Sequence, residues 1–174
     1  MALVKTLTQG TSVDTRAWVE KAKQLAPLVE QYRDEAERER RLPQPLFEAV
    51  RDAGFMQMLM PRALGGDQAD LSVALQVYEE LARHDGGSAW ALMILSGGSV
   101  LSDYFSAQVA REIFVDGACI TAGNLGPAGR AQPVPGGFRV SGQWPFASGC
   151  HHANWFNCGC TVVDSDTPPA AGSP

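Results

Sequence analysis

The sequence predicts an α+β fold, with an all-α helical domain over residues 1–117 followed by a β-domain over residues 118–174. Three changes near residue 118 support this division. Of 14 basic and 19 acidic residues, only Arg130, Arg139, Asp164 and Asp166 lie after it. Half of the 18 glycines lie in the last third of the chain. The spacing of apolar residues also changes there from a helical period to that of strands and turns.

Five helices are predicted in the first domain from apolar residues spaced three and four positions apart. They cover residues 18–41, 45–54, 70–82, 88–101 and 106–114. Gly54 is typical of a helix end, and Asp70 is suited to cap the third helix. The fourth helix is apolar almost all round and is predicted to be central and buried. Gly97 and Gly98 within it suggest close approach by a backbone or a ligand.

The second domain is predicted to contain short strands at 119–121, 130–134, 138–141 and 155–163, with a loop at 123–129. Val134-Pro135-Gly136-Gly137 places Pro and Gly where a type II turn needs them, so the flanking strands should pair antiparallel. Residues 164–174 are turn-rich and add no strand. So few strands leave an open sheet edge, which predicts an incomplete antiparallel β-domain.

Charge and hydropathy exclude several classes of protein. The formal net charge of -5 argues against a nucleic-acid partner. The longest apolar run, 89–95, is too short for a membrane span. The N-terminus lacks the apolar core of a secretory signal, so a cytoplasmic location with four free cysteine thiols is expected.

The densest group of unusual residues lies between Gly142 and Trp155. It contains Trp144, Phe146, Ser148 and two histidines in a glycine-rich stretch. Such residues can form a flat apolar slot with a few polar contacts, which suits a planar heterocyclic cofactor. The alternative is a strand-turn-strand unit whose aromatic residues anchor the core, and composition alone favours this alternative.

Two other groups of residues are considered as a metal site and as an acid-base catalyst. A metal site would use Cys150, His151, His152, Cys158 and Cys160, but their spacing matches no paired zinc-binding motif, and no metal is predicted. His84, next to Asp85, is interpreted as a partner of a helix end and not as an acid-base catalyst.

Several motifs resemble the N-terminal half of the acyl-CoA dehydrogenase family. In the helical part they are Arg41-Leu-Pro43, Ala53-Gly54-Phe55, Leu64-Gly65-Gly66 and the stretch from Tyr78 to Trp90. In the β-domain, the stretch from Gly136 to Gly149 is similar to the family branch that contains two-component flavin-dependent monooxygenases.

The resemblance implies a flavoenzyme that binds FAD or FMN. The resemblance implies that Ser148 is a catalytic residue whose hydroxyl lies near the reactive edge of the flavin. It also implies that Gly123, Asn124, Trp144, Phe146 and Ser148 contact the cofactor. The expected reaction is hydroxylation of a small organic substrate by reduced flavin and oxygen. Dehydrogenation of an acyl-CoA with bound FAD is the alternative.

Family members continue into a C-terminal helical bundle that supplies the catalytic base. The chain is therefore expected to be inactive alone, with its base beyond residue 174. A truncated, non-catalytic oligomerisation or binding module is the alternative from another class. The resemblance further implies a separate flavin reductase as a possible partner and a homo-oligomer, such as a homotetramer, for the full-length protein.

Overall fold

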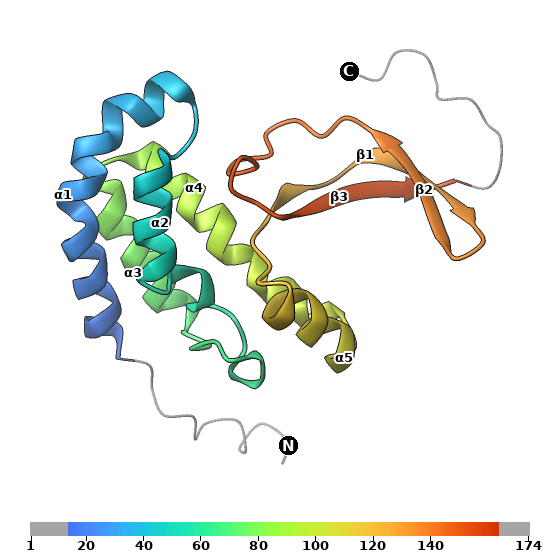
Figure 1. Cartoon of the computed structure of the whole chain (residues 1–174), viewed down its shortest axis with the longest axis horizontal. Helices are drawn as coiled ribbons and strands as arrows, with labels where there is room; N and C mark the ends of the chain where they lie inside the picture. Colours follow the sequence, from blue (N-terminus) through green and yellow to red (C-terminus); the bar gives the residue numbers. More distant parts are fainter. Residues whose placement is uncertain (1–13, 164–174) are drawn as a thin grey trace.

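The computed structural model describes residues 14–163, in which helices precede a three-stranded sheet (Figure 1). The α-helices are α1 Thr15–Glu39, α2 Gln44–Asp52, α3 Leu71–Ala82, α4 Gly86–Gly97 and α5 Ala107–Ala110. The remaining helical pieces are the 3₁₀ segments η1 Phe55–Gln57, η2 Arg62–Leu64 and η3 Gly98–Tyr104, and the π-helical η4 Arg111–Asp116. The predicted α+β class is confirmed. The turn-rich stretch at 164–174 lies outside the described residues.

Local sequence signals set several helix ends. The Asp14 carboxylate caps α1 by accepting hydrogen bonds from the backbone N–H groups of Arg16 and Ala17. Gly54 follows α2 with φ +88°, a left-handed conformation that favours glycine. Asp70 stands at the predicted cap position of α3, but its side chain makes no capping hydrogen bond. Among residues 14–163, no helix is both long and apolar enough to cross a membrane.

The core lies among α1 to α4 (Figure 1). Trp18 of α1 meets Phe55 edge-on, with ring centroids 5.3 Å apart. Leu46 and Leu92 are fully buried, and each contributes about 1.5–3 kcal/mol by leaving water. The hydroxyls of Tyr78 and Ser96 lie 2.8 Å apart and join α3 to α4 inside this core. The helices therefore bury a continuous apolar centre of their own.

Helix α4 is central but not buried all round, contrary to the sequence-based expectation. Its side chains Ala89, Leu92 and Leu95 are buried, whereas Trp90 is 57% exposed. The expected close approach is found at Gly98, where a Cβ atom would overlap the Thr121 hydroxyl at the start of the sheet. One face of α4 thus remains free of the helical core and is turned toward the rest of the chain.

The sheet has the strand order β2-β1-β3, with β1 Thr121–Val134, β2 Gly137–Gly142 and β3 Trp155–Val162. Strands β1 and β2 pair antiparallel across the predicted turn, where Gly136 has φ +85°. The predicted loop at 123–129 is wrong, because these residues belong to β1. The pairing of β1 with β3 shifts register between Asn124 and Gly129.

The expectation of an antiparallel sheet holds for β1 and β2 but not for β3, which pairs parallel to β1. The reason is the 143–154 connection, which carries the chain from the end of β2 back to the beginning of β1. Trp155 can therefore start β3 opposite Thr121, and both strands run in the same direction. A parallel pair requires a long connection of this kind, whereas a short turn produces an antiparallel pair.

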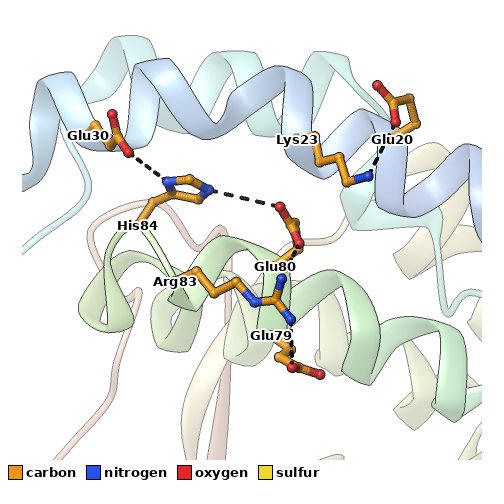
Figure 2. A network of polar contacts seen from close by, with 7 residues as sticks. All are labelled: Glu20, Lys23, Glu30, Glu79, Glu80, Arg83 and His84. Carbon is orange, nitrogen blue, oxygen red and sulfur yellow. Dashed lines mark hydrogen bonds and ion pairs between the residues drawn. The ribbon is translucent and has the colours of Figure 1, made fainter.

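Polar contacts tie the end of α3 to α1, as Figure 2 shows. His84 Nδ1 lies 2.7 Å from Glu30 Oε1 of α1, and His84 Nε2 lies 3.9 Å from Glu80 Oε1 of α3. Arg83 reaches Glu79 at 3.0 Å and Glu80 at 3.3 Å. The His84 side chain is therefore engaged in a link between α3 and α1.

Candidate functional site

Residues 143–154, called here the linking segment, connect β2 to β3 and fold back toward α4 (Figure 1). Overlapping turns make the middle of this segment compact. The Ser148 N–H donates to the Phe146 carbonyl at 2.7 Å, the Cys150 N–H to Ala147 at 3.0 Å and the His152 N–H to Gly149 at 2.9 Å. Backbone bonds therefore fix the relative positions of the residues from 146 to 152.

The linking segment contacts the helices at two points on α4. Trp90 Nε1–H donates a hydrogen bond to Ser148 Oγ at 3.2 Å. Gly149 packs on Leu95 so closely that an added Cβ would lie 2.7 Å from two Leu95 side-chain carbons. Gly149 also has φ +80°, so both its conformation and its surroundings favour glycine.

A third contact joins the linking segment to the connection between α1 and α2. His152 Nε2 lies 2.7 Å from the backbone oxygen of Leu42. The imidazole also stacks on Phe47 of α2, with centroids 4.2 Å apart and an interplanar angle of 17°. Burial lowers the pKa of His152 from its ordinary value of 6.5, so the ring is neutral at pH 7.

The first residues of the linking segment lie against the sheet. Trp144 covers Gly129 and Gly142, where a Cβ atom would meet the indole, and its Nε1–H donates to the Gly159 carbonyl at 2.8 Å. Asn124 of β1 donates from Nδ2 to the Pro145 carbonyl at 3.1 Å. These bonds fix Trp144 and Pro145, and Phe146 follows them directly.

Phe146 has an unusual position for a large apolar residue. Its backbone has φ +59°, and its side chain is 91% exposed. Left-handed backbone is strained for a bulky residue, and strain of this kind is concentrated at functional sites. Phe146 is thus presented outward by a fixed backbone, which indicates a surface that contacts another molecule.

A cavity of about 580 Å³ lies between the linking segment, the end of α1 and the start of α4. Trp90 and Ser148 form part of its wall, together with charged or titratable residues. Those residues are Glu37, Arg40, Arg41, Asp85, Cys150, His151 and His152. The volume is within the range of small-molecule sites, and the wall offers an aromatic surface beside hydrogen-bonding groups.

Ser148 has a specific hydrogen-bonding capacity at this wall. Its oxygen accepts the Trp90 indole proton, so its own hydroxyl proton is directed elsewhere. The side chain is half-buried, where a hydrogen bond to a ligand competes less with water than on the surface. Ser148 can therefore donate to an acceptor placed beside the linking segment.

The cysteines and histidines do not form a metal centre in the described part of the chain. No group of three or more His, Cys, Asp or Glu side chains within residues 14–163 is arranged to hold a metal ion. Cys119, Cys150, Cys158 and Cys160 are free thiols, as predicted. Burial raises the pKa of Cys119 to about 11, which keeps that thiol protonated and unreactive at neutral pH.

The structure separates the predicted site residues into two groups. Ser148 lines the cavity, whereas Trp144 and Asn124 lie at the sheet, with the exposed Phe146 between them in the chain. Gly123 has φ +146° and packs on the Asn157 backbone, where a Cβ would overlap main-chain atoms. Its immediate role is therefore close strand packing.

Sequence reasoning missed Trp90 and His152 as site residues. Trp90 was hidden within an apolar stretch that predicted a buried helix. His152 was considered as a metal ligand and as one of two histidines in the predicted cofactor slot, but not as a contact to the helices. A signal for Trp90 was present, since it lies two residues after Gly86, Gly87 and Ser88, where small residues leave the start of a helix open.

Comparison with known proteins identifies relatives over most of the chain. The family model described as "Acyl-CoA dehydrogenase, N-terminal domain" matches residues 14–114. The oxygenase subunit HsaA of a flavin-dependent monooxygenase from Rhodococcus jostii (strain RHA1) is 29% identical over 145 residues, covering 83% of this chain and 38% of that protein. The oxygenase component of p-hydroxyphenylacetate 3-hydroxylase from Acinetobacter baumannii is 29% identical over 165 residues, covering 94% and 39%.

Solved structures show the same relationship. The crystal structure of the HsaA monooxygenase from M. tuberculosis matches with a TM-score of 0.81 and 27% identity, covering 90% of this chain and 43% of that one. The chain thus spans about two fifths of the length of these proteins. The predicted resemblance, including the monooxygenase branch, is confirmed.

Proposed function

Because this chain belongs to the acyl-CoA dehydrogenase family, we propose that it forms part of a flavin-dependent oxygenase that hydroxylates a small organic substrate. In this reaction one oxygen atom of O₂ enters the substrate and the other leaves as water, and bound reduced flavin supplies the two electrons. The similarity to oxygenase subunits of flavin-dependent monooxygenases supports hydroxylation over acyl-CoA dehydrogenation.

The residues present suit a flavin, which needs an apolar surface for its ring system and hydrogen-bond donors along its polar edge. The strained, exposed Phe146 supplies an apolar surface. The Ser148 hydroxyl supplies a donor. Its oxygen accepts the hydrogen bond from the Trp90 indole, so its own hydrogen is available to a ligand. We assign cofactor contact to Gly123, Asn124, Trp144, Phe146 and Ser148. Asn124 and Trp144 act mainly by holding the linking segment against the sheet.

The Ser148 hydroxyl carries this assignment. Trp90, 58 positions away in the sequence, donates a hydrogen bond to the Ser148 oxygen. The turns of the linking segment fix the Ser148 backbone. A hydroxyl oriented before binding donates without a further loss of rotational freedom, which favours a flavin atom over water as its acceptor. Ser148 thereby binds the cofactor and orients it as a hydrogen-bond donor.

The cavity beside Ser148 is the proposed place for the organic substrate. Trp90 offers an aromatic face, and polar groups at the cavity wall can fix the orientation of a small molecule. A separate flavin reductase is the proposed source of reduced flavin, since the similar protein from A. baumannii is named as an oxygenase component. A homo-oligomer, such as a homotetramer, is proposed from the family resemblance alone.

Anaerobic titration of the 174-residue chain with photoreduced FAD or FMN tests this function. We expect binding by the parent chain. Ser148→Ala should weaken it about 5- to 10-fold, because one hydrogen bond contributes about 1 kcal/mol. Ser141→Ala is the control, since Ser141 is exposed on β2.

Three outcomes would contradict this proposal. Equal affinity of the Ser148→Ala variant and the parent would remove Ser148 from the site. Bleaching of bound oxidised flavin by an acyl-CoA would indicate dehydrogenation instead. A parent chain that binds neither flavin would favour a non-catalytic binding module.

A further inference from the structure

His152 makes the most specific contact between the linking segment and the helices. Its Nε2 atom lies 2.7 Å from the Leu42 carbonyl oxygen, which can only accept a hydrogen bond. Nε2 must therefore carry the hydrogen, which fixes the tautomer of a neutral ring. Leu42 is buried in the connection between α1 and α2, so its carbonyl requires a partner inside the protein.

The backbone transmits the position of His152 to Ser148. The two residues are four positions apart, and the bonds from Cys150 to Ala147 and from His152 to Gly149 span the interval. A displacement of His152 therefore moves the turn that carries Ser148. Gly149 packs on Leu95 without a hydrogen bond, so this contact limits the approach of the segment but does not orient it.

We infer that His152 is a positioning residue, whose hydrogen bond to the Leu42 carbonyl determines where the Ser148 hydroxyl stands relative to Trp90. The bond sets one wall of the cavity, since both Ser148 and His152 line it. Any effect of His152 on bound flavin rests on the function proposed above. The placement of Ser148 against Trp90 is independent of that function.

The surroundings of His152 favour its neutral form. Burial is the main cause of its lowered pKa, the bond to Leu42 acts in the opposite direction, and His151 and Arg41 lower the pKa further. Arg41 is paired with Glu39 at 3.0 Å. Phe47, which stacks on the ring, is uncharged and provides no counter-ion. The lowered pKa selects the neutral ring at pH 7, and the neutral tautomer with its hydrogen on Nε2 donates to Leu42.

The hydrogen bond and the ring stacking can be separated by substitution. His152→Gln places an amide N–H at a reach similar to that of Nε2 but removes the ring. His152→Phe retains a ring over Phe47 but has no donor. If the hydrogen bond positions Ser148, the Gln variant should resemble the parent and the Phe variant should not.

The indole Nε1–H resonance of Trp90 reports the result in ¹⁵N-labelled chain without flavin. It is assigned by its loss in Trp90→Phe. We expect His152→Phe to move it to its position in Ser148→Ala, and His152→Gln to leave it near the parent position. The Trp144 indole, bonded to the Gly159 carbonyl, is the internal control and should not move. An unchanged Trp90 resonance in His152→Phe would overturn the inference.

The ¹⁵N shifts of the parent histidines give a second test that needs no destabilising variant. We expect His152, assigned by its absence from His152→Gln, to show a protonated Nε2 and an unprotonated Nδ1 at pH 7.5. The opposite tautomer would refute the bond to Leu42. Both measurements omit flavin, so a chain that fails to bind flavin contradicts the proposed function and leaves this inference intact.

Discussion

Substitution of Gly149 by alanine tests the packing of the linking segment on α4. Two effects should destabilise the folded chain. An alanine at φ +80° is strained by about 1–2 kcal/mol. The new Cβ would also lie 2.7 Å from Cγ and Cδ2 of the buried Leu95, and overpacking of this kind costs about 1–3 kcal/mol. We therefore expect a total loss of about 2–5 kcal/mol.

Gly136→Ala is a matched control, because Gly136 has a similar φ of +85° and no atom within 4 Å of the added Cβ. Urea unfolding followed by far-UV circular dichroism measures both variants. The excess loss in Gly149→Ala, about 1–3 kcal/mol, belongs to the contact with Leu95. The double variant Gly149→Ala with Leu95→Ala should lose less unfolding free energy than the sum of the losses in the two single variants. The smaller side chain at position 95 makes room for the added Cβ. Equal losses in both glycine variants would show that the segment does not rest on Leu95.

Two further predictions concern pH and self-association. The pKa of His152 is lower in the folded chain than its ordinary value of 6.5, so its contribution to stability is complete above pH 6.5 and is lost as pH falls further. The urea midpoint should therefore fall more between pH 7.5 and pH 5.5 in the parent than in His152→Gln. An equal fall in both proteins would contradict this prediction. Trp155, Phe156 and Val162 on the edge strand β3 are exposed, so sedimentation should show concentration-dependent association that Val162→Lys reduces. A monomer at every concentration would exclude this association.

Local features of the chain were predictable from the sequence. Apolar spacing located the α-helices that form the core, because one buried face requires that spacing. Gly54 and Gly136 marked turns correctly, since few other residues adopt positive φ without strain. The stretch around Ser148 stands out in the sequence as well, because it combines aromatic and polar residues with glycine.

Pairings over long distances in sequence were not predictable. The parallel alignment of β3 with β1 depends on the path of the linking segment, and strand periodicity contains no information about that path. The bond from Trp90 to Ser148 joins residues 58 positions apart on different elements. A single sequence gives the residue types at both ends of such a contact but not their distance.

The position of Trp144 constrains what substitutions the sheet can tolerate. Its indole occupies the space where side chains at Gly129 and Gly142 would stand, on two paired strands, and its N–H binds the third strand at Gly159. The two glycines cost about 1–2 kcal/mol together relative to alanine in strands. One side chain from outside the strands thus replaces the cross-strand pairs that normally stabilise a sheet. A side chain at Gly129 would also meet the Cys160 sulfur, and one at Gly142 would meet the Gly129 backbone, so a smaller residue at Trp144 would not by itself make room at either glycine.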